Sequence, residues 1–187
     1  MSNFLSNLVE VSGNENASSV DKGLVSDIRG FIDTGSYTLN ALLSGSLYGG
    51  IPDNKITALA GEQATGKTFF CFNILKTFLA DNPDGVVLYF DSEQAITSQM
   101  FSERDIDPSR VAVLPVSTIE EFRHQMIQVA DTYRAESDKK PILVILDSLG
   151  NLSTIKEMED TASGKNVRDM TKAQALKATF RTLTVKC

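Results

Sequence analysis

The sequence predicts an α/β protein in which a mostly parallel sheet is covered by helices on both faces. Four short apolar runs predict strands at residues 55–60, 86–90, 111–114 and 142–146, and helical patterns separate them. Strands that are apolar along their whole length are typical of a parallel sheet that is buried on both sides. With 187 residues, 42% of them hydrophobic, the chain is long enough for about one domain with a buried core.

The first predicted strand leads into a phosphate-binding loop. Eight residues fit the pattern G-x-x-x-x-G-K-[ST]: Gly61, Glu62, Gln63, Ala64, Thr65, Gly66, Lys67 and Thr68. Glycines let main-chain N–H groups turn toward phosphate oxygens, and the helix expected from residue 69 onward adds the positive end of its dipole. Lys67 is therefore predicted to reach the terminal phosphates of ATP, and the Thr68 hydroxyl to bind Mg²⁺.

Acidic residues follow the second and fourth predicted strands, at the edge of the sheet where ligands bind. Asp147 is predicted to be the second Mg²⁺ residue, acting directly or through water. Its alternative role is to cap the segment that follows. Asp91 and Glu93 are both candidates to position the water that attacks the γ-phosphate, and the pattern leaves that choice open. Ser92 and Ser148 follow acids without a partner histidine, which argues against a serine-hydrolase triad.

The third predicted strand, 111–114, is stopped by Pro115, and a helix is expected after it. Ser117 and Thr118 open a predicted helix with glutamates at capping-box distance. His124, the only histidine, lies in the middle of this helix and is interpreted as a surface or half-buried residue. A polar loop is expected over residues 153–164, followed by a helix over 166–182. The loop either is simply solvated, which its own acids favour, or presents basic residues to a polynucleotide: Lys165, Arg168 and Lys172.

Composition excludes several classes of protein. The net charge of −6 gives no global attraction to nucleic acid, no apolar run approaches the length of a membrane helix, and the first residues do not form a secretory signal. Cys71 and Cys187 have neither metal-ligand spacing nor the pattern of a disulfide framework, so a reducing cytoplasm is expected. Residues 1–30 combine a short amphipathic helix with a flexible linker. They form either a frayed terminus, which composition favours, or an arm that docks on a neighbouring subunit.

An ordered series of motifs resembles the ATPase core of RecA-type strand-exchange recombinases, and most resembles the UvsX branch of large tailed phages. The series comprises 34–36, 42–45, 49–52, the phosphate-binding loop 61–68, 89–93 and 146–152, and the resemblance extends over about residues 30–187. It implies a RecA-like P-loop core over 31–187. It also implies a protein that binds ATP between subunits, forms helical filaments on single-stranded DNA, pairs that DNA with duplex DNA, and works with mediator and single-strand-binding proteins.

The resemblance also assigns residues. It makes Glu93, rather than Asp91, the residue that activates water. It makes 154–165 a DNA-binding loop, which adds Lys156 to the basic candidates. It makes residues 1–30 an arm that contacts the neighbouring protomer. Met100 occupies the position of an adenine-stacking tyrosine, and Phe101 is its rival for that contact.

Family members continue with further core strands and a second DNA-binding loop, so the core is expected to be incomplete at its C-terminus. The chain alone is then expected to be poorly stable and inactive in strand exchange. The alternatives are a hexameric RecA-fold helicase and a non-catalytic ATP-binding regulator.

Overall fold

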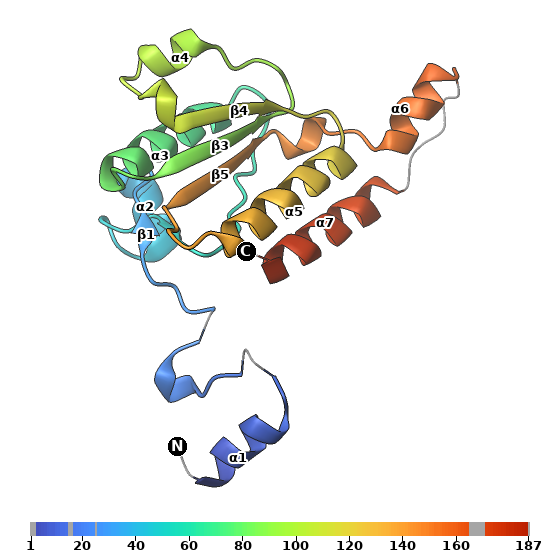
Figure 1. Ribbon diagram of the computed structural model, residues 1–187. Helices are drawn as coiled ribbons and strands as arrows, with labels where there is room; N and C mark the ends of the chain where they lie inside the picture. Colours follow the sequence, from blue (N-terminus) through green and yellow to red (C-terminus); the bar gives the residue numbers. More distant parts are fainter. Residues whose placement is uncertain (1–2, 15–16, 25, 165–170, 187) are drawn as a thin grey trace.

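The centre of the protein is a three-stranded parallel sheet in the order β4–β3–β5 (Figure 1). The computed structural model describes residues 3–14, 17–24, 26–164 and 171–186. The strands are β3 (Val86–Asp91), β4 (Val111–Pro115) and β5 (Ile142–Asp147). In the register, Tyr89 lies beside Val113 on one side and Ile145 on the other. The predicted α/β architecture with a parallel sheet is confirmed.

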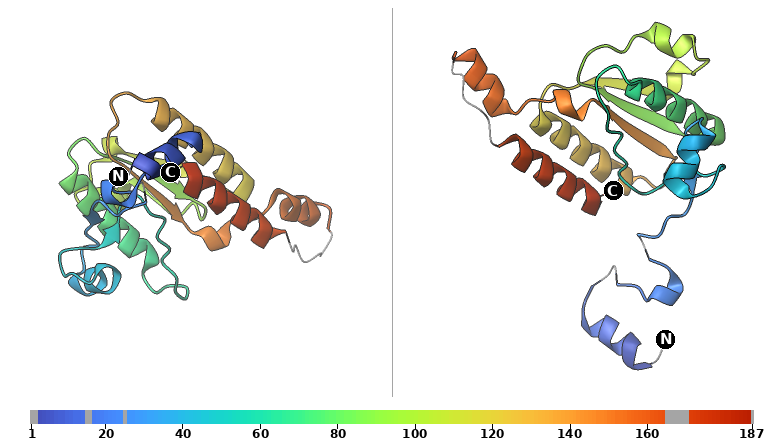
Figure 2. Two further views of the ribbon diagram at one scale, coloured as in Figure 1. Left: turned by 90° about the horizontal axis from the view of Figure 1, so that it is seen from below. Right: turned by 180° about the vertical axis from the view of Figure 1, so that it is seen from behind.

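Helices cover both faces of this sheet, as Figures 1 and 2 show. On one face lie α3 (Lys67–Asp81) and α4 (Ser98–Ser102), and on the other α5 (Ile119–Ala135) and α7 (Lys172–Lys186). Alternate residues of β3 point to opposite sides, so Val87 and Tyr89 join the core cluster under α3, whereas Leu88 and Phe90 face α5. The Phe90 ring meets Phe122 of α5 edge-on, with 5.0 Å between the ring centroids. Burial on both faces explains the unbroken apolar run of β3, whereas β4, although also apolar, is largely exposed.

The other elements are short. They are α1 (Asn3–Val11), the 3₁₀ helix η1 (Val20–Lys22), β1 (Phe31–Ile32), α2 (Tyr37–Ser44), β2 (Ile51–Pro52), the 3₁₀ helices η2 (Pro108–Arg110) and η3 (Leu149–Asn151), and α6 (Ile155–Ala162). β1 and β2 pair antiparallel, beside the core. α1 lies at the end of an extended arm, well away from the sheet (Figures 1 and 2). Within the described ranges, no helix has both the length and the apolar composition needed to cross a bilayer.

A buried polar network fixes the turn that joins β1 to α2. The fully buried Asn40 accepts hydrogen bonds from the amide and the hydroxyl of Thr34, at 3.0 and 2.7 Å. Its amide group donates to Asp33 Oδ1 at 2.8 Å and to the Leu47 carbonyl at 3.0 Å. The Thr77 hydroxyl of α3 donates to the Asp33 carbonyl. The network therefore attaches the segment before the phosphate-binding loop to the helix after it.

Arg110 joins the end of α3 to the start of β4. Its guanidinium donates to the carbonyl of Leu79 at 3.1 Å, to that of Gly85 at 3.0 and 2.9 Å, and to that of Asn82. The last carbonyls of a helix have no partner within the helix and carry partial negative charge, so an arginine is a favourable cap there. This cap helps to hold α3, and hence the loop at its N-terminus, against the sheet.

Three predicted elements differ from the structure. Residues 55–60 are all described and form no strand; a β-ladder requires a hydrogen-bonded neighbour, and no described strand pairs with this segment. The polar segment 153–164 is not a loop but contains α6. Thr154 caps α6, with its hydroxyl accepting from the Glu157 amide at 3.0 Å. The last helix, expected over 166–182, is described as α7 from Lys172 and extends to Lys186; residues 165–170 lie outside the described part of the chain.

Two helix predictions are confirmed. α1 forms where the apolar pattern of the first residues placed a helix. α5 starts directly after Thr118, whose hydroxyl accepts from the Glu121 amide at 3.2 Å, while the Glu121 carboxylate accepts from the Ser117 amide at 3.0 Å. His124 is exposed on α5, as expected.

Candidate functional site

The main chain of the loop at 61–68 forms a tight curl that leads into the first turn of α3. Ala64 (φ 61°) and Gly66 (φ 89°) adopt left-handed backbone conformations, and Gly66 is the N-cap of the helix. The Lys67 ammonium group donates to the carbonyls of Gly61 at 3.0 Å and Glu62 at 2.7 Å, so it reaches back across the loop. A helix N-terminus preceded by such a curl concentrates main-chain N–H groups and positive dipole at one point, which suits an anion such as a phosphate.

Asp147, at the end of β5, lies against the first turn of α3. The Thr68 hydroxyl donates to Asp147 Oδ2 at 2.7 Å, although 79 residues separate the two. The capping alternative for Asp147 is wrong, because Ser148 is the N-cap residue of η3 and the Asp147 carboxylate bonds to α3 instead. A hydroxyl and a carboxylate in contact supply the oxygen ligands that Mg²⁺ prefers, and Mg²⁺ typically takes one or two carboxylates together with substrate phosphates and water. The residues present therefore fit this ion.

Two weak acids surround the same carboxylate and remain neutral. The Tyr89 hydroxyl of β3 also donates to Asp147 Oδ2, at 2.8 Å. Burial, and then the hydrogen bond to Asp147, raise the pKa of Tyr89 well above its ordinary value. Burial together with the charge of Asp147 raises the pKa of the Cys71 thiol, on the next turn of α3, to about 12. The side of Asp147 that faces the core is thus lined by uncharged groups.

Asp91 and Glu93, the two rivals after β3, are in different environments. Asp91 is 3% exposed, and its carboxylate accepts from the amides of Glu93 and Ile96, both at 3.0 Å. It therefore shapes the turn that follows the strand. Glu93 is exposed, and its Oε1 accepts from the Ser148 hydroxyl at 2.9 Å. Of the two, Glu93 is the carboxylate that a nucleotide or a water can approach.

Ser92 and Ser148 fasten the tips of β3 and β5 to each other. The Ser148 amide donates to the Ser92 hydroxyl at 2.8 Å, and that hydroxyl donates to the Ser148 carbonyl at 2.7 Å. Asn151 adds a bond from its side-chain amide to the Ser92 carbonyl at 2.8 Å. The peptide between Asp147 and Ser148 is cis. The sequence pattern argues only against a serine-hydrolase triad and did not predict this link, although a serine directly follows the acid at the end of both strands.

The two candidates for adenine contact are placed differently. Phe101 is buried in the core under α3, with its ring centroid 5.1 Å from that of Phe72, so it cannot replace the stacking tyrosine. Met100 is only partly buried and packs against the same core cluster. Its carbonyl accepts from Arg104 at 2.8 Å, and the Arg104 guanidinium lies 4.9 Å from the Phe72 ring centroid. Met100 thus remains the candidate for adenine contact.

Two of the predicted DNA-binding residues, Lys156 and Lys172, lie beyond the same edge of the sheet. Lys156 is exposed on α6, which projects from the core (Figures 1 and 2). The Lys172 ammonium group, at the start of α7, donates to the Gly150 carbonyl at 3.1 Å and so lies close to the turn after Asp147. Lys165 and Arg168 lie outside the described residues. α6 also carries the half-exposed apolar side chains of Ile155 and Met158.

Sequence comparison with known proteins identifies relatives of this chain. No protein-family model matches the sequence. The chain is 32% identical over 184 residues to the recombination and repair protein of Enterobacteria phage T4, covering 98% of this chain and 46% of that protein. The chain is a relative of the RecA-type recombinases.

Two more distant RecA-type relatives support this assignment. The RecA protein of Malacoplasma penetrans is 27% identical over 153 residues, covering 76% of this chain and 44% of RecA. The DNA repair and recombination protein RadB of Thermoplasma acidophilum is 27% identical over 129 residues, covering 69% of this chain and 53% of RadB. The chain thus spans about half the length of these relatives.

Proposed function

We propose that this chain forms the nucleotide-binding core of an ATP-dependent recombinase that assembles on single-stranded DNA and promotes homologous pairing and strand exchange. The observation that carries the proposal is the contact between Thr68 and Asp147 at 2.7 Å, which joins the phosphate-binding loop to the carboxylate at the tip of β5. That arrangement, with an exposed glutamate at the neighbouring strand tip, fits Mg·ATP hydrolysis. The relatives named for recombination and repair support DNA recombination as the process that this hydrolysis would serve.

Each residue has a distinct part in this proposal. The main-chain amides of 61–66 bind phosphate oxygens, and the Lys67 ammonium group exchanges its present carbonyl partners for the terminal phosphates. Thr68 and Asp147 would hold Mg²⁺, which when bound neutralises charge on the phosphates. Glu93 accepts a hydrogen bond from the attacking water and draws its proton away, and Ser148 keeps the Glu93 side chain beside Asp147. Met100 lies against the nucleotide base.

The DNA-binding part of the proposal rests on where the chain goes after Asp147. Only η3 and a short turn separate this residue from α6. The turn is attached to the start of α5, because the Ile119 amide donates to the Ser153 carbonyl at 2.9 Å and the Ser153 amide to the Ser117 carbonyl at 3.0 Å. Lys156 on α6 and Lys172 on α7 would contact DNA phosphates, together with Lys165 and Arg168. A change at the nucleotide can therefore reach the DNA through a short, hydrogen-bonded path.

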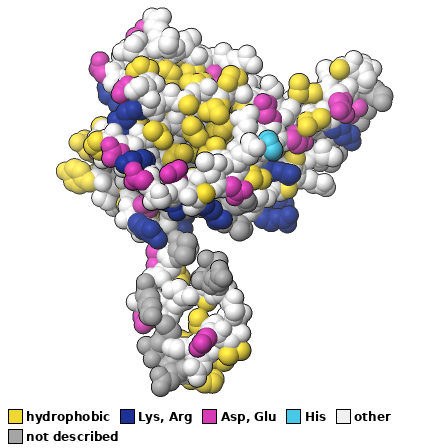
Figure 3. All heavy atoms as spheres, viewed as in Figure 1, with side chains coloured by type: hydrophobic (Ala, Val, Ile, Leu, Met, Phe, Trp, Pro, Cys, Tyr) yellow, Lys and Arg dark blue, Asp and Glu magenta, His cyan; other side chains and the backbone are white. Residues whose placement is uncertain are grey.

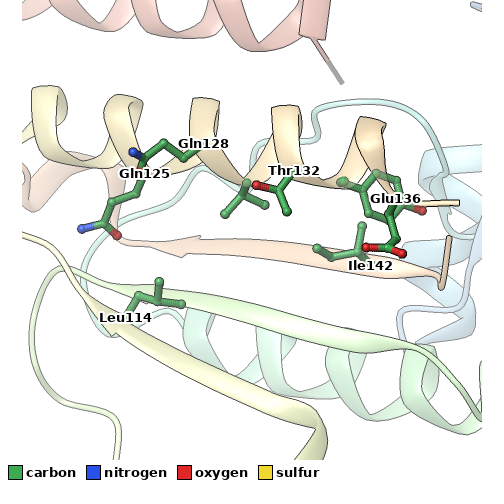
Figure 4. Close-up of a pocket in the computed structure, with 8 residues that line it drawn as sticks. Leu114, Gln125, Gln128, Thr132, Glu136 and Ile142 are labelled. Atoms are coloured by element: carbon green, nitrogen blue, oxygen red, sulfur yellow. The ribbon is translucent and has the colours of Figure 1, made fainter. Parts of the chain in front are cut away.

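Assembly of subunits is assigned to the N-terminal arm. α1 exposes an apolar face made of Phe4, Leu5, Leu8 and Val11. The core offers a groove of about 630 Å³ between α5 and the sheet (Figure 4). Leu114 of β4 and Ile142 of β5 line it on the sheet side, and α5 with its C-cap contributes Val129, Tyr133 and the polar residues Gln125, Gln128, Thr132 and Glu136. Hydrophobic side chains gather over this open part of the sheet (Figure 3). The apolar face of α1 is complementary to the apolar side chains that line this groove. We therefore expect α1 of one copy to dock into the groove of the next copy.

Nucleotide binding tests the first part of the proposal. Wild-type protein and the Lys67→Ala variant are titrated with a fluorescent ATP analogue in the presence and absence of Mg²⁺, and ATP turnover is measured with and without single-stranded DNA. We expect Mg²⁺-dependent binding that Lys67→Ala abolishes, and turnover that DNA stimulates. Equal binding by the variant would refute the loop assignment. Binding without DNA-stimulated turnover would instead favour a non-catalytic ATP-binding regulator.

Electron microscopy and light scattering test the assembly. Wild-type protein with ATP and single-stranded DNA is expected to form helical filaments, whereas closed rings would indicate a hexameric helicase. Leu8→Asp places a charge on the apolar face of α1, and Ser6→Asp places the same charge on its polar face. We expect Leu8→Asp to prevent assembly and Ser6→Asp to leave it intact. Filaments of normal length from Leu8→Asp would rule out docking through α1.

A further inference from the structure

Tyr89 is an unusual residue for the centre of a core. Its side chain is 0% exposed and belongs to the cluster under α3, where its ring lies 5.9 Å from that of Phe72. A phenylalanine would fill the same space without bringing a hydroxyl that has to be satisfied. A buried hydroxyl without a partner costs about 1–3 kcal/mol, so its hydrogen bond to Asp147 decides whether tyrosine is tolerated here.

The register of the sheet brings this hydroxyl to Asp147. Tyr89 lies beside Ile145 on the neighbouring strand, and Asp147 follows two residues further on, with its side chain on the same face. Two residues of a strand span about 6.6 Å, a distance that a tyrosine ring and its hydroxyl can bridge. The result is a bond of 2.8 Å to Oδ2, the oxygen that also accepts from Thr68 at 2.7 Å. One donor comes from β3 and the other from α3, so the carboxylate is held from two elements.

We propose that Tyr89 is a positioning residue for the Mg²⁺ site, which holds the Asp147 carboxylate in the orientation that meets Thr68. The inference rests on the proposed nucleotide site. Carboxylates that bind metals are themselves hydrogen-bonded in proteins, and loss of such a partner typically lowers metal affinity by about 10- to 100-fold. Tyr89 touches neither phosphate nor water in this assignment; it acts only through Asp147.

The test is Tyr89→Phe, which removes one oxygen atom and keeps the packing of the ring. Mn²⁺ is used as a probe that electron paramagnetic resonance detects, and its affinity is measured in the presence of a non-hydrolysable ATP analogue. We expect Mn²⁺ affinity to fall about tenfold or more, while affinity for the analogue without metal stays unchanged. Tyr48→Phe makes the same chemical change on an exposed ring and serves as the matched control, with wild-type affinity for both.

The possible outcomes separate the inference from the proposed function. Wild-type Mn²⁺ affinity in a folded Tyr89→Phe variant refutes the positioning role and leaves the nucleotide site standing. Equal losses of Mn²⁺ affinity and of metal-free nucleotide affinity also refute it, because they indicate a general loss of structure. Wild-type protein that binds the analogue no better with Mn²⁺ than without it would overturn the proposed site and this inference with it.

Discussion

Asp91 and Glu93 are two residues apart, and the structure predicts opposite consequences of neutralising them. Asp91→Asn should destabilise the fold, whereas Glu93→Gln should leave stability unchanged and remove hydrolysis. The reason is that the Asp91 carboxylate is buried and bonded to two main-chain amides, while Glu93 is exposed and accepts a hydrogen bond from the Ser148 hydroxyl. The two variants make the same chemical change, from carboxylate to amide. They therefore test whether Asp91 stabilises the turn after β3 and Glu93 acts in hydrolysis.

The expected loss of unfolding free energy follows from the number of hydrogen-bond acceptors that each side chain offers. Both oxygens of Asp91 accept a main-chain bond at 3.0 Å, but asparagine offers one oxygen and turns an NH₂ group toward the other amide. Bonds to a charged acceptor are worth about 1.5–3 kcal/mol, and a buried amide without a partner costs about 1–3 kcal/mol. We therefore expect Asp91→Asn to lower the free energy of unfolding by about 2–4 kcal/mol. Glutamine at 93 keeps an acceptor for Ser148, so its effect should stay within about 0.5 kcal/mol.

Urea denaturation followed by circular dichroism measures this difference. With a typical denaturant slope of about 2 kcal/mol per molar urea, the midpoint of Asp91→Asn should fall by about 1–2 M. Glu93→Gln should denature with wild-type protein, bind Mg·ATP normally, and lose turnover by about 10²- to 10⁴-fold. A wild-type midpoint for Asp91→Asn, or a comparable loss of stability in Glu93→Gln, would refute the division of roles.

Three further predictions concern the frame around the site. Gly50→Ala should lower the melting temperature sharply, because a Cβ at this residue (φ 141°) would lie 2.0 Å from the Ile32 carbonyl oxygen; unchanged melting would contradict the close approach. Arg110→Lys should cost about 2 kcal/mol in chemical denaturation, since a single ammonium group cannot bond all the carbonyls at the end of α3; a loss near zero would show that the cap is dispensable. The pKa of the Cys71 thiol rises from 9.0 to about 12 on folding, so its contribution to stability is complete below pH 9 and is lost as the pH rises toward 12. The slope of unfolding free energy against pH in that window should become less negative in Cys71→Ala, by up to about 1.4 kcal/mol per pH unit, and equal slopes for variant and wild type would exclude the thiol as the cause.

The sequence predicted those parts of the site that depend on local chemistry. The loop at 61–68, the acids at the ends of β3 and β5 and the capped start of α5 all follow from residue type and spacing over a few positions. The choice between Asp91 and Glu93 did not follow, because the two acids differ in what their surroundings bond to rather than in their place in the sequence. Burial and hydrogen-bond partners decide such a choice.

Other features could not be predicted because they depend on partners far along the chain. Residues 55–60 have the composition of a strand, but only a neighbour can turn an extended segment into part of a sheet. The cap of α6, by contrast, is local: Thr154 and Glu157 are at capping distance in the sequence, but the polar composition of this segment favoured a loop. The bond from Tyr89 to Asp147 requires the register between β3 and β5, which no local pattern contains.

The two internal bonds of Lys67 have a consequence for affinity. Its ammonium group already has acceptors in the carbonyls of Gly61 and Glu62, so an incoming phosphate must displace them rather than simply add a contact. The lysine therefore contributes to the binding free energy only the difference between a phosphate and a carbonyl as hydrogen-bond acceptor. An uncharged or singly charged ligand gains little when it replaces the carbonyls. In the proposed nucleotide site, a lysine with internal acceptors would therefore discriminate by anionic charge and favour a triphosphate over a diphosphate.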